Sequence, residues 1–568
     1  MFHVKQSPRF PLPMLEFETC AGQFGRLFYG EPRTLRRKKH HQGMTVMLRS
    51  VLRATLMSCL ALTACSQEKP YAVEDVSLAQ LSADLAARKT TSAAVTQAYI
   101  DRIRMYNAPL NAIIAVAPDA LAQARASDKR RAEGKALGPL DGVPMILKDN
   151  IDATGMPTTA GSFALAENLR ADDAEVTKRL KDAGAVILAK ANLSQWAGYR
   201  TTDSFAGSTV GGTPHNPYDL TKSAAGSSSG SGIAMATSFG AGALGTDTSG
   251  SITGPTNVNG IAGLRPTRGL LSRRGIVPIT ELQDTAGPMA RSVTDVAMML
   301  TVLAGSDPGD PRTKDADAHK TDYAKALDAG ALKGARIGVL RPQGNADAKA
   351  GPAFDKALEV LKAQGAELVE LPGPLENLNE VGLAAEAYNF NRDIAAYLKD
   401  SPPAVKVRTV DDLLAFNKSD PRESKISAIY WEEAAASKGD MNDPKYLELM
   451  EYIQRRAGPE GYDALFSQNN IQAFVTPAGG PAGVIPEDGK PRTGGRGQGP
   501  GSFTRNAAIG GYPILTVPMG AVEGMPVGLS LVGPQWSEQT LLSFGYSYEK
   551  AGYKRVPPAA YKKAAQAR

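Results

Sequence analysis

Short apolar runs alternate with stretches of helical periodicity along most of the chain. The candidate strands are 112–116, 143–147, 185–189, 336–340, 367–371, 473–476, 514–517 and 529–532. Helical periodicity is found in 78–106, which predicts two helices broken near 88–91, and again in 174–183 and 353–364. This alternation predicts an α/β fold in which helices cover a buried sheet.

Two later segments break the alternation. Residues 375–462 lack strand-like runs and have helical patterns interrupted by Pro and charge, which predicts a helical insertion. Residues 479–501 are rich in Gly and Pro, which predicts a loop. Aromatic residues of the insertion, such as Tyr388, Phe390 and Tyr430, either line a pocket or, as is commoner, belong to the core.

The N-terminal region is predicted to be a targeting segment. Met47 opens a segment with Arg49 and Arg53, followed by the apolar run 56–62. That run is too short to span a bilayer and is typical of a signal peptide. It ends in Leu-Thr-Ala-Cys, which resembles a bacterial lipobox and implies cleavage before Cys65 and attachment of a lipid there. A plain secretory signal with an incidental cysteine is the alternative.

The net charge of +6 does not predict a nucleic-acid partner. Residues 1–64 hold ten of the 64 basic and three of the 58 acidic residues, so the remainder has 54 basic and 55 acidic residues. The basic excess therefore lies in a segment that we expect to be removed, and no basic face is predicted for the body.

Cysteine usage limits the chemistry. The cysteines are Cys20, Cys59 and Cys65, so the body has no thiol. This excludes a cysteine nucleophile, a disulfide and a cysteine-rich zinc site in the body. We expect no cofactor and no metal.

Two Ser- and Gly-rich stretches, 225–232 and 245–251, are the candidate site. A flexible linker would not alternate with the apolar runs 233–236 and 240–244. A phosphate loop is excluded because no Gly-Lys-Ser/Thr follows. Small residues instead allow consecutive backbone N–H groups to face one cavity, where they stabilise a developing oxyanion. A serine at the end of such a turn is placed to attack.

A serine nucleophile needs a base. After residue 65 the only histidines are His215, in a turn-like context, and His319, in a charged stretch. Both contexts are more typical of structural or solvated histidines. Lys148 is the other candidate, because burial at the end of the run 143–147 would favour a neutral amine. The alternative for Lys148 is an ion pair with Asp149 at a sheet edge.

Taken together, these stretches resemble the amidase signature family. The matching blocks are 142–149, 226–230 and 245–252, with 158–162, 190–194, 263–267, 284–291 and 511–518 in support. The resemblance covers about residues 77–551. It implies a large mixed β-sheet with helices on both faces and a helical insertion. The domains expected are an N-terminal extension with signal peptide (1–64), a tether (65–76) and one amidase domain (77–556).

The resemblance also implies the site residues. Ser251 would be the nucleophile, Ser227 the bridging serine and Lys148 the base. The backbone N–H groups of Thr248, Ser249, Gly250 and Ser251 would hold the oxyanion. The implied reaction is hydrolysis of a carboxamide C–N bond through an acyl-enzyme, on small acyl amides or peptide amides.

Two departures from the family pattern bear on function. Ser249 stands where glycine is common, and Thr253 stands where many members carry an arginine that is typical of glutamyl-tRNA amidotransferases. The segments 251–255 and 272–278 look closer to peptide amidases. The alternatives are a His-dependent esterase, a non-catalytic binding lipoprotein and a glutamyl-tRNA amidotransferase A-like subunit. The expected location is the periplasmic face of a bacterial membrane, through the lipid anchor only.

Overall fold

The structure is a computed structural model that describes residues 71–200, 207–341, 348–373, 375–486 and 502–566. The signal peptide, Cys65 and residues 487–501 of the Gly- and Pro-rich loop lie outside these residues. None of the described helices is long and apolar enough to cross a bilayer.

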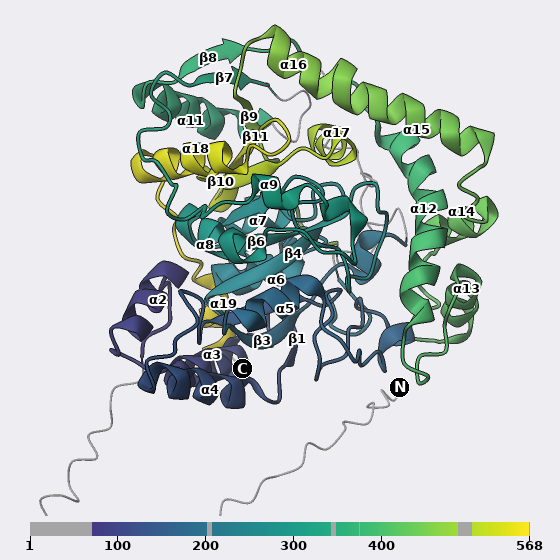
Figure 1. Cartoon of the computed structure of the whole chain (residues 1–568), viewed down its shortest axis with the longest axis horizontal. Coiled ribbons are helices and arrows are strands. Elements are labelled where there is room, and N and C mark those ends of the chain that lie inside the picture. Colours follow the sequence, from purple (N-terminus) through teal and green to yellow (C-terminus); the bar gives the residue numbers. More distant parts are fainter. Residues whose placement is uncertain (1–70, 201–206, 342–347, 374, 487–501, 567–568) are drawn as a thin grey trace, which may run out of the picture. The chain divides into compact units, whose positions relative to one another are not determined.

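One mixed sheet forms the centre of the described chain (Figure 1). Its eleven strands lie in the order β1-β3-β2-β4-β6-β5-β10-β11-β9-β7-β8. The strands are β1 Ile113–Val116, β2 Pro144–Lys148, β3 Val186–Ala191, β4 Gly242–Asp247, β5 Ala262–Arg265, β6 Thr285–Ala290, β7 Arg336–Val339, β8 Glu367–Glu370, β9 Ala473–Pro477, β10 Ile514–Val522 and β11 Met525–Val532. β2 is parallel to β3 and β4, and β7 is parallel to β8 and β9, whereas the other pairs are antiparallel. The predicted α/β fold is confirmed.

Helices cover both faces of this sheet. One face carries α6 (Ser229–Ala236) and α7 (Thr253–Asn259); the other carries α5 (Glu175–Asp182), α8 (Val293–Leu303), α11 (Gly351–Ala363) and α18 (Glu538–Ala551). Two glycines of β4 show how closely the helices approach the sheet on each face. A Cβ at Gly245 would lie 2.8 Å from Ser228 Oγ beside α6, and a Cβ at Gly242 would lie 2.7 Å from the sulfur of Met299 in α8. The central strand therefore needs residues without side chains.

That requirement explains why the sequence did not predict β4, β5 and β6. These strands are rich in Gly and Ala, and β6 contains Pro288 opposite Leu244 of β4. β-Branched and aromatic residues mark strands only where side chains have room to pack, and Pro in a strand argues against a central position. Here the helices occupy that room.

The predicted helical insertion is confirmed between β8 and β9. It consists of α12 (Asn379–Lys399), α13 (Val410–Ser419), α14 (Ile429–Ser437), α15 (Pro444–Ala457) and α16 (Asp463–Gln468), drawn in green in Figure 1. Thr409 and Asp412 form a capping box at the start of α13. The buried ion pair between Arg200 and Glu423 joins the insertion to the body.

The ends of the described chain pack on the body. The predicted N-terminal helices are α2 (Leu78–Ala86) and α3 (Ser92–Tyr106), followed by α4 (Ala120–Ala132). Residues 71–76 do not behave as the predicted tether, because Val73 is 3% exposed within the core. At the other end, α19 (Ala560–Gln566) places Tyr561 edge-on against Tyr106 of α3. The body thus extends beyond the predicted limits of 77 and 556, because apolar side chains at both ends are buried.

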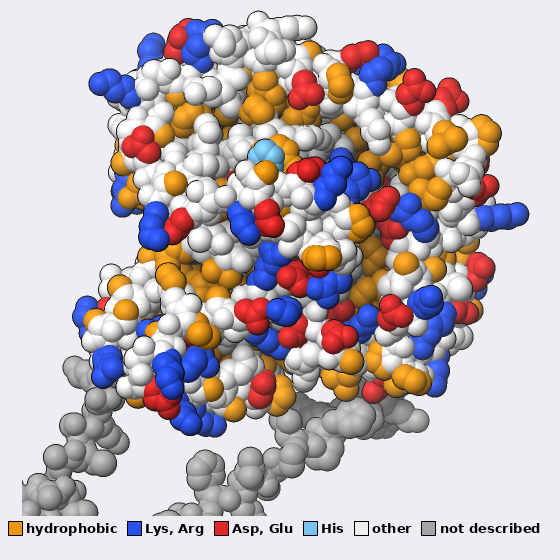
Figure 2. Space-filling view, in the orientation of Figure 1, with side chains coloured by type: hydrophobic (Ala, Val, Ile, Leu, Met, Phe, Trp, Pro, Cys, Tyr) orange, Lys and Arg blue, Asp and Glu red, His pale blue; other side chains and the backbone are white. Residues whose placement is uncertain are grey.

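Charged side chains of both signs share the surface that Figure 2 shows. On this face, the basic and acidic side chains of the described residues are interspersed with one another. Exposed charges of opposite sign also pair elsewhere among the described residues, for example Lys178 with Asp182. This face therefore has the mixed charge that the near-neutral balance of the body leads one to expect.

Candidate active site

Two parallel neighbouring strands bring the candidate residues together. Lys148 ends β2 and Asp247 ends β4, and the register pairs Leu147 with Leu244. Parallel strands have their carboxyl ends at the same edge of a sheet. Segments about one hundred residues apart in the sequence therefore meet at this edge.

Lys148 lies among hydroxyl groups. Its side chain is fully buried. Its Nζ donates to Ser227 Oγ at 2.6 Å, to Thr246 Oγ1 at 2.7 Å and to the Thr246 carbonyl at 3.3 Å. Asn150 Nδ2 donates to the same Thr246 Oγ1 at 3.0 Å. The short contact between Lys148 and Ser227 is close enough for proton transfer between them.

The carboxyl group next to Lys148 in the sequence, which the alternative role for Lys148 required as its partner, pairs with another lysine. Asp149 pairs with Lys190 of β3, with 3.3 Å between Oδ1 and Nζ, and also accepts from Thr159. Lys190 further donates to the Ile151 carbonyl at 2.5 Å. Burial raises the pKa of the Asp149 carboxyl, and Lys190 opposes that shift.

The first Ser/Gly stretch is packed and is not a linker. Ser227 is 3% exposed, and Ser228 is fully buried. A Cβ at Gly230, in the first turn of α6, would lie 2.3 Å from the Ala112 carbonyl, so only glycine fits there. The Ser228 N–H donates to the Ser251 carbonyl at 3.1 Å. The candidate relay serine and nucleophile are thus brought together on adjacent backbone segments.

The second Ser/Gly stretch is a tight turn held by a carboxylate. Asp247 accepts from the Gly250 N–H at 2.8 Å and from the Ile252 N–H at 2.6 Å, one bond to each oxygen. Gly250 has a φ of +107°, which favours glycine. Arg265 of β5 pairs with Asp247 at 3.0 Å, and both side chains are fully buried. The charge that fixes the turn is therefore neutralised inside the protein.

The predicted oxyanion donors lie on this turn. The Gly250 N–H donates to Asp247, so it would have to share that bond to contact a substrate oxygen. The Thr248 hydroxyl donates to Asp284 at 2.6 Å, and Ser249 Oγ accepts from Arg505 at 3.2 Å. Ser251 is half-buried and lies two residues before the start of α7 at Thr253. Sequence reasoning did not identify Thr246, Arg265 or Arg505, because each acts through contacts with residues distant in the chain. Asp247 was also missed, although its bonds to the Gly250 and Ile252 N–H groups are local.

The two histidines have other surroundings. His215 Nδ1 lies 2.7 Å from the Leu220 carbonyl in a local turn. His319 is exposed and stacks on Trp536, with ring centroids 4.2 Å apart. Neither belongs to the Lys148 cluster, which agrees with their interpretation as structural or solvated residues.

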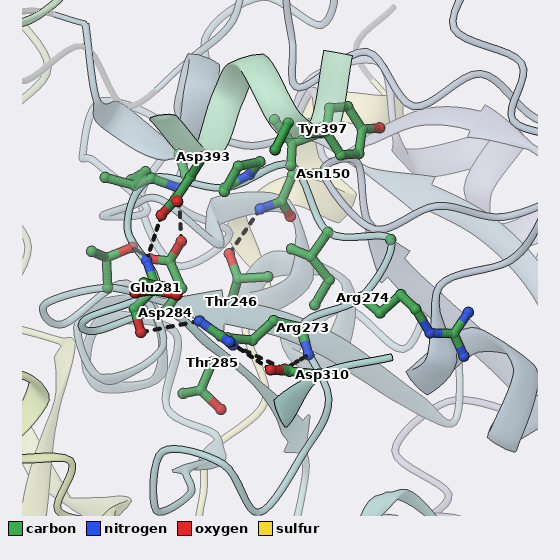
Figure 3. Close-up of a pocket in the computed structure, with 18 of the residues that line it drawn as sticks. Asn150, Thr246, Arg273, Arg274, Glu281, Asp284, Thr285, Asp310, Asp393 and Tyr397 are labelled. Carbon is green, nitrogen blue, oxygen red and sulfur yellow. Dashed lines mark hydrogen bonds and ion pairs between the residues drawn. The ribbon is translucent and has the colours of Figure 1, made fainter. Parts of the chain in front are cut away.

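A cavity of about 400 Å³ adjoins the cluster (Figure 3). Its lining includes Asn150, Thr246 and Thr248, so Thr246 borders both the cavity and Lys148. Arg273 lines another wall and pairs with Asp310 at 2.6 Å. The cavity is of the size that accommodates a small-molecule ligand.

The cavity wall formed by α12 carries one perturbed carboxyl group. Burial raises the pKa of Asp393 to about 6, although the adjacent Arg392 opposes the shift. Tyr388, Phe390 and Tyr430 of the insertion are buried in hydrophobic clusters, as expected of core residues. Among the described residues, no group of three or more His, Cys, Asp or Glu side chains could hold a metal ion.

Comparisons with known proteins agree with this arrangement. The Amidase family pattern matches residues 94–542. A probable amidase of Arabidopsis thaliana is 32% identical over 526 residues, covering 89% of this chain and 95% of that protein. A putative amidase of Schizosaccharomyces pombe is 32% identical over 533 residues, covering 86% of this chain and 87% of that protein. The crystal structure of the native peptide amidase from Stenotrophomonas maltophilia is 41% identical, with a TM-score of 0.80, and covers 86% of this chain and 99% of that one.

The chain belongs to the amidase family and has the amidase signature fold. It is an enzyme that hydrolyses amide bonds.

Proposed function

We propose that this amidase cleaves the C–N bond of a carboxamide through an acyl-enzyme on Ser251. The observation that carries this proposal is the 2.6 Å contact between the buried Lys148 amine and Ser227, beside the backbone bond from Ser228 to Ser251. A serine hydroxyl becomes an effective nucleophile when an adjacent base accepts its proton. Lys148, relayed by Ser227, is such a base.

The proposed reaction has two halves. Ser251 Oγ attacks the substrate carbonyl carbon, while its proton passes to Ser227 and the Ser227 proton passes to Lys148. The tetrahedral intermediate collapses, the relay returns a proton to the leaving nitrogen, and ammonia or an amine departs. Water then attacks the Ser251 ester while its proton passes through Ser227 to Lys148. The relay returns that proton to Ser251 Oγ as the acyl C–O bond breaks, and the carboxylic acid is released. N–H groups of the turn 248–251 stabilise the oxyanion in both halves.

We propose small acyl amides or C-terminal peptide amides as the substrates. Support comes from the size of the adjoining cavity and from the peptide amidase neighbour, one structure of which holds the competitive inhibitor chymostatin. A role in a glutamyl-tRNA amidotransferase is less favoured, because Thr253 replaces the expected arginine. A non-catalytic binding role does not explain the Lys148–Ser227 contact.

The test is covalent labelling combined with turnover. A fluorophosphonate probe should label the wild-type enzyme at Ser251, and a panel of peptide amides and acyl amides should show ammonia release. Ser251→Ala should lose both labelling and turnover while keeping its melting temperature. Wild-type turnover in Ser251→Ala, or labelling at another serine, would overturn the assignment.

We also propose that the protein is an exported bacterial lipoprotein anchored through Cys65 and facing the periplasm. The support is the signal-like run 56–62 and the lipobox-like ending at Cys65. Expression of the full chain with a radiolabelled fatty acid should label the protein and retain it with membranes. Cys65→Ser should lose the label; a labelled Cys65→Ser variant, or an unlabelled wild-type chain, would contradict the proposal.

A further inference from the structure

Ser249, a departure from the usual glycine, has a specific partner. Its Oγ accepts a hydrogen bond from Arg505 Nη2 at 3.2 Å. Arg505 belongs to α17 (Ser502–Gly510), which follows the insertion and β9 in the chain. The neighbouring Thr504 hydroxyl lies 3.4 Å from the Ser249 carbonyl. Helix α17 therefore contacts both the side chain and the backbone of this residue.

Arg505 is itself held by buried groups. Its Nη1 pairs with Glu386 of α12, and the two side chains are 2% and 0% exposed. Gln283 Nε2 donates to the same Glu386 oxygen at 2.9 Å. Breaking a charged pair with so little exposure is costly, because it leaves a buried charge without its partner.

The contacts continue to the other end of the turn. The Gln283 carbonyl accepts from Arg265 Nη2 at 2.7 Å, and Arg265 pairs with Asp247. The path from Asp247 through Arg265, Gln283, Glu386 and Arg505 to Ser249 consists of contacts between buried residues, except at Ser249, which is half-buried. This path connects Asp247 with Ser249, at the two ends of the segment 247–249. The start of the turn is therefore held by buried contacts at both of these residues.

We propose that Arg505 is a positioning residue that fixes the oxyanion turn through the hydroxyl of Ser249. The proposal rests on the proposed function, in which N–H groups of this turn stabilise the oxyanion. A guanidinium bonds Glu386 and Ser249 with different nitrogens in a fixed plane, whereas a lysine ammonium supplies one flexible point charge. Ser249 thus gives this enzyme an attachment point that glycine lacks.

The experiment compares Arg505→Lys, Ser249→Ala and the double variant on one amide substrate. Each single variant should lower kcat about 10- to 100-fold, because misplacing oxyanion donors weakens binding of the transition state. KM should change less than about threefold, because the ground-state contacts remain. If Arg505 acts through Ser249, the double variant should be no slower than the slower single variant. Arg336→Lys, on the distant strand β7, is the matched control and should keep wild-type kcat.

Three outcomes would overturn the proposal: wild-type kcat in Arg505→Lys, wild-type kcat in Ser249→Ala, or multiplicative losses in the double variant. If Arg505→Lys fails to fold, Ser249→Ala alone decides, because it removes only one hydroxyl from a half-buried position. Ser251→Ala is assayed beside them. Activity in Ser251→Ala would refute the proposed function, whereas its inactivity with unaffected Arg505→Lys would refute only the role of Arg505.

Discussion

Lys190 Nζ lies 3.3 Å from Asp149 Oδ1 in the interior of the protein, one strand away from Lys148. Both members of this pair are essentially without solvent exposure. The negative charge next to Lys148 in the sequence is therefore engaged by a different lysine. The two lysines have separate roles, one in an ion pair and the other among hydroxyl groups.

The Lys190–Asp149 pair should be a stability element. Lys190→Met leaves a buried carboxylate without its cation, and removal of one partner from a buried pair typically costs about 3–5 kcal/mol. Denaturant unfolding should show a loss of this order. The double variant Lys190→Met/Asp149→Asn should recover part of it, and a double variant less stable than Lys190→Met would contradict the pairing.

Substitution of Lys148 should affect catalysis far more than stability. Lys148→Met keeps the shape of the side chain but removes the base, so kcat should fall by about 10²–10⁴-fold. Lys148→Arg should be equally inactive, because a guanidinium does not accept a proton at neutral pH. Steady-state kinetics and melting curves separate the two effects; an active Lys148→Met enzyme would exclude the relay.

Asp247→Asn should disturb the turn and its buried ion pair together. The carboxylate accepts one backbone N–H with each oxygen, whereas an amide has only one acceptor and its NH₂ would oppose a second donor. Arg265 would also lose its counter-ion. We expect a loss of stability of about 3–5 kcal/mol and of at least about tenfold in kcat. Asp182→Asn, at an exposed ion pair on α5, is the matched control and should keep wild-type kcat and stability.

Glu549 should make stability depend on pH. Burial raises the pKa of its carboxyl from 4.5 to about 7, and the nearby Asp295 adds to the shift. Between these two pH values the folded protein keeps a proton that the unfolded chain releases, so this group's contribution to stability falls as the pH rises. Glu549→Gln retains an acceptor for the Val293 N–H. It should be more stable than the wild type above pH 8 by on the order of 2 kcal/mol and similar to it below pH 4.5.

Melting curves of both proteins from pH 4 to 9 would check this. A difference between wild type and Glu549→Gln that does not change with pH would exclude Glu549 as the titrating group.

The sequence predicted the periphery of the sheet better than its centre. Strands such as β3 and β11 contain short apolar runs and were located within a few residues. Strands β4 to β6 were missed, because close helix packing selects Gly, Ala and even Pro288 where pattern analysis expects branched side chains. The residue types of these strands are determined by packing against the helices, and a local sequence pattern does not reveal such packing.

The candidate site likewise has residues that the sequence could identify and residues that it could not. Lys148, Ser227 and Ser251 stand in short motifs and could be named from the sequence, and the structure places the three segments together. Asp247 was present in a motif, but its buried charge is balanced by Arg265, which lies 18 residues later in an unpredicted strand. Arg505 and Glu386 lie 119 residues apart, and no sequence spacing could connect them.

The parallel pairing of β2 with β4 has a consequence for refolding. Lys148 and Thr246 are 98 residues apart, so their contact closes a long loop that contains β3 and α6. Contacts so distant in the chain form slowly, because the entropy of closing the loop has to be overcome first. Local helices form much earlier than such distant pairings. During refolding, enzyme activity should therefore recover later than the helical circular dichroism signal. The time at which activity returns would report when β2 and β4 have paired.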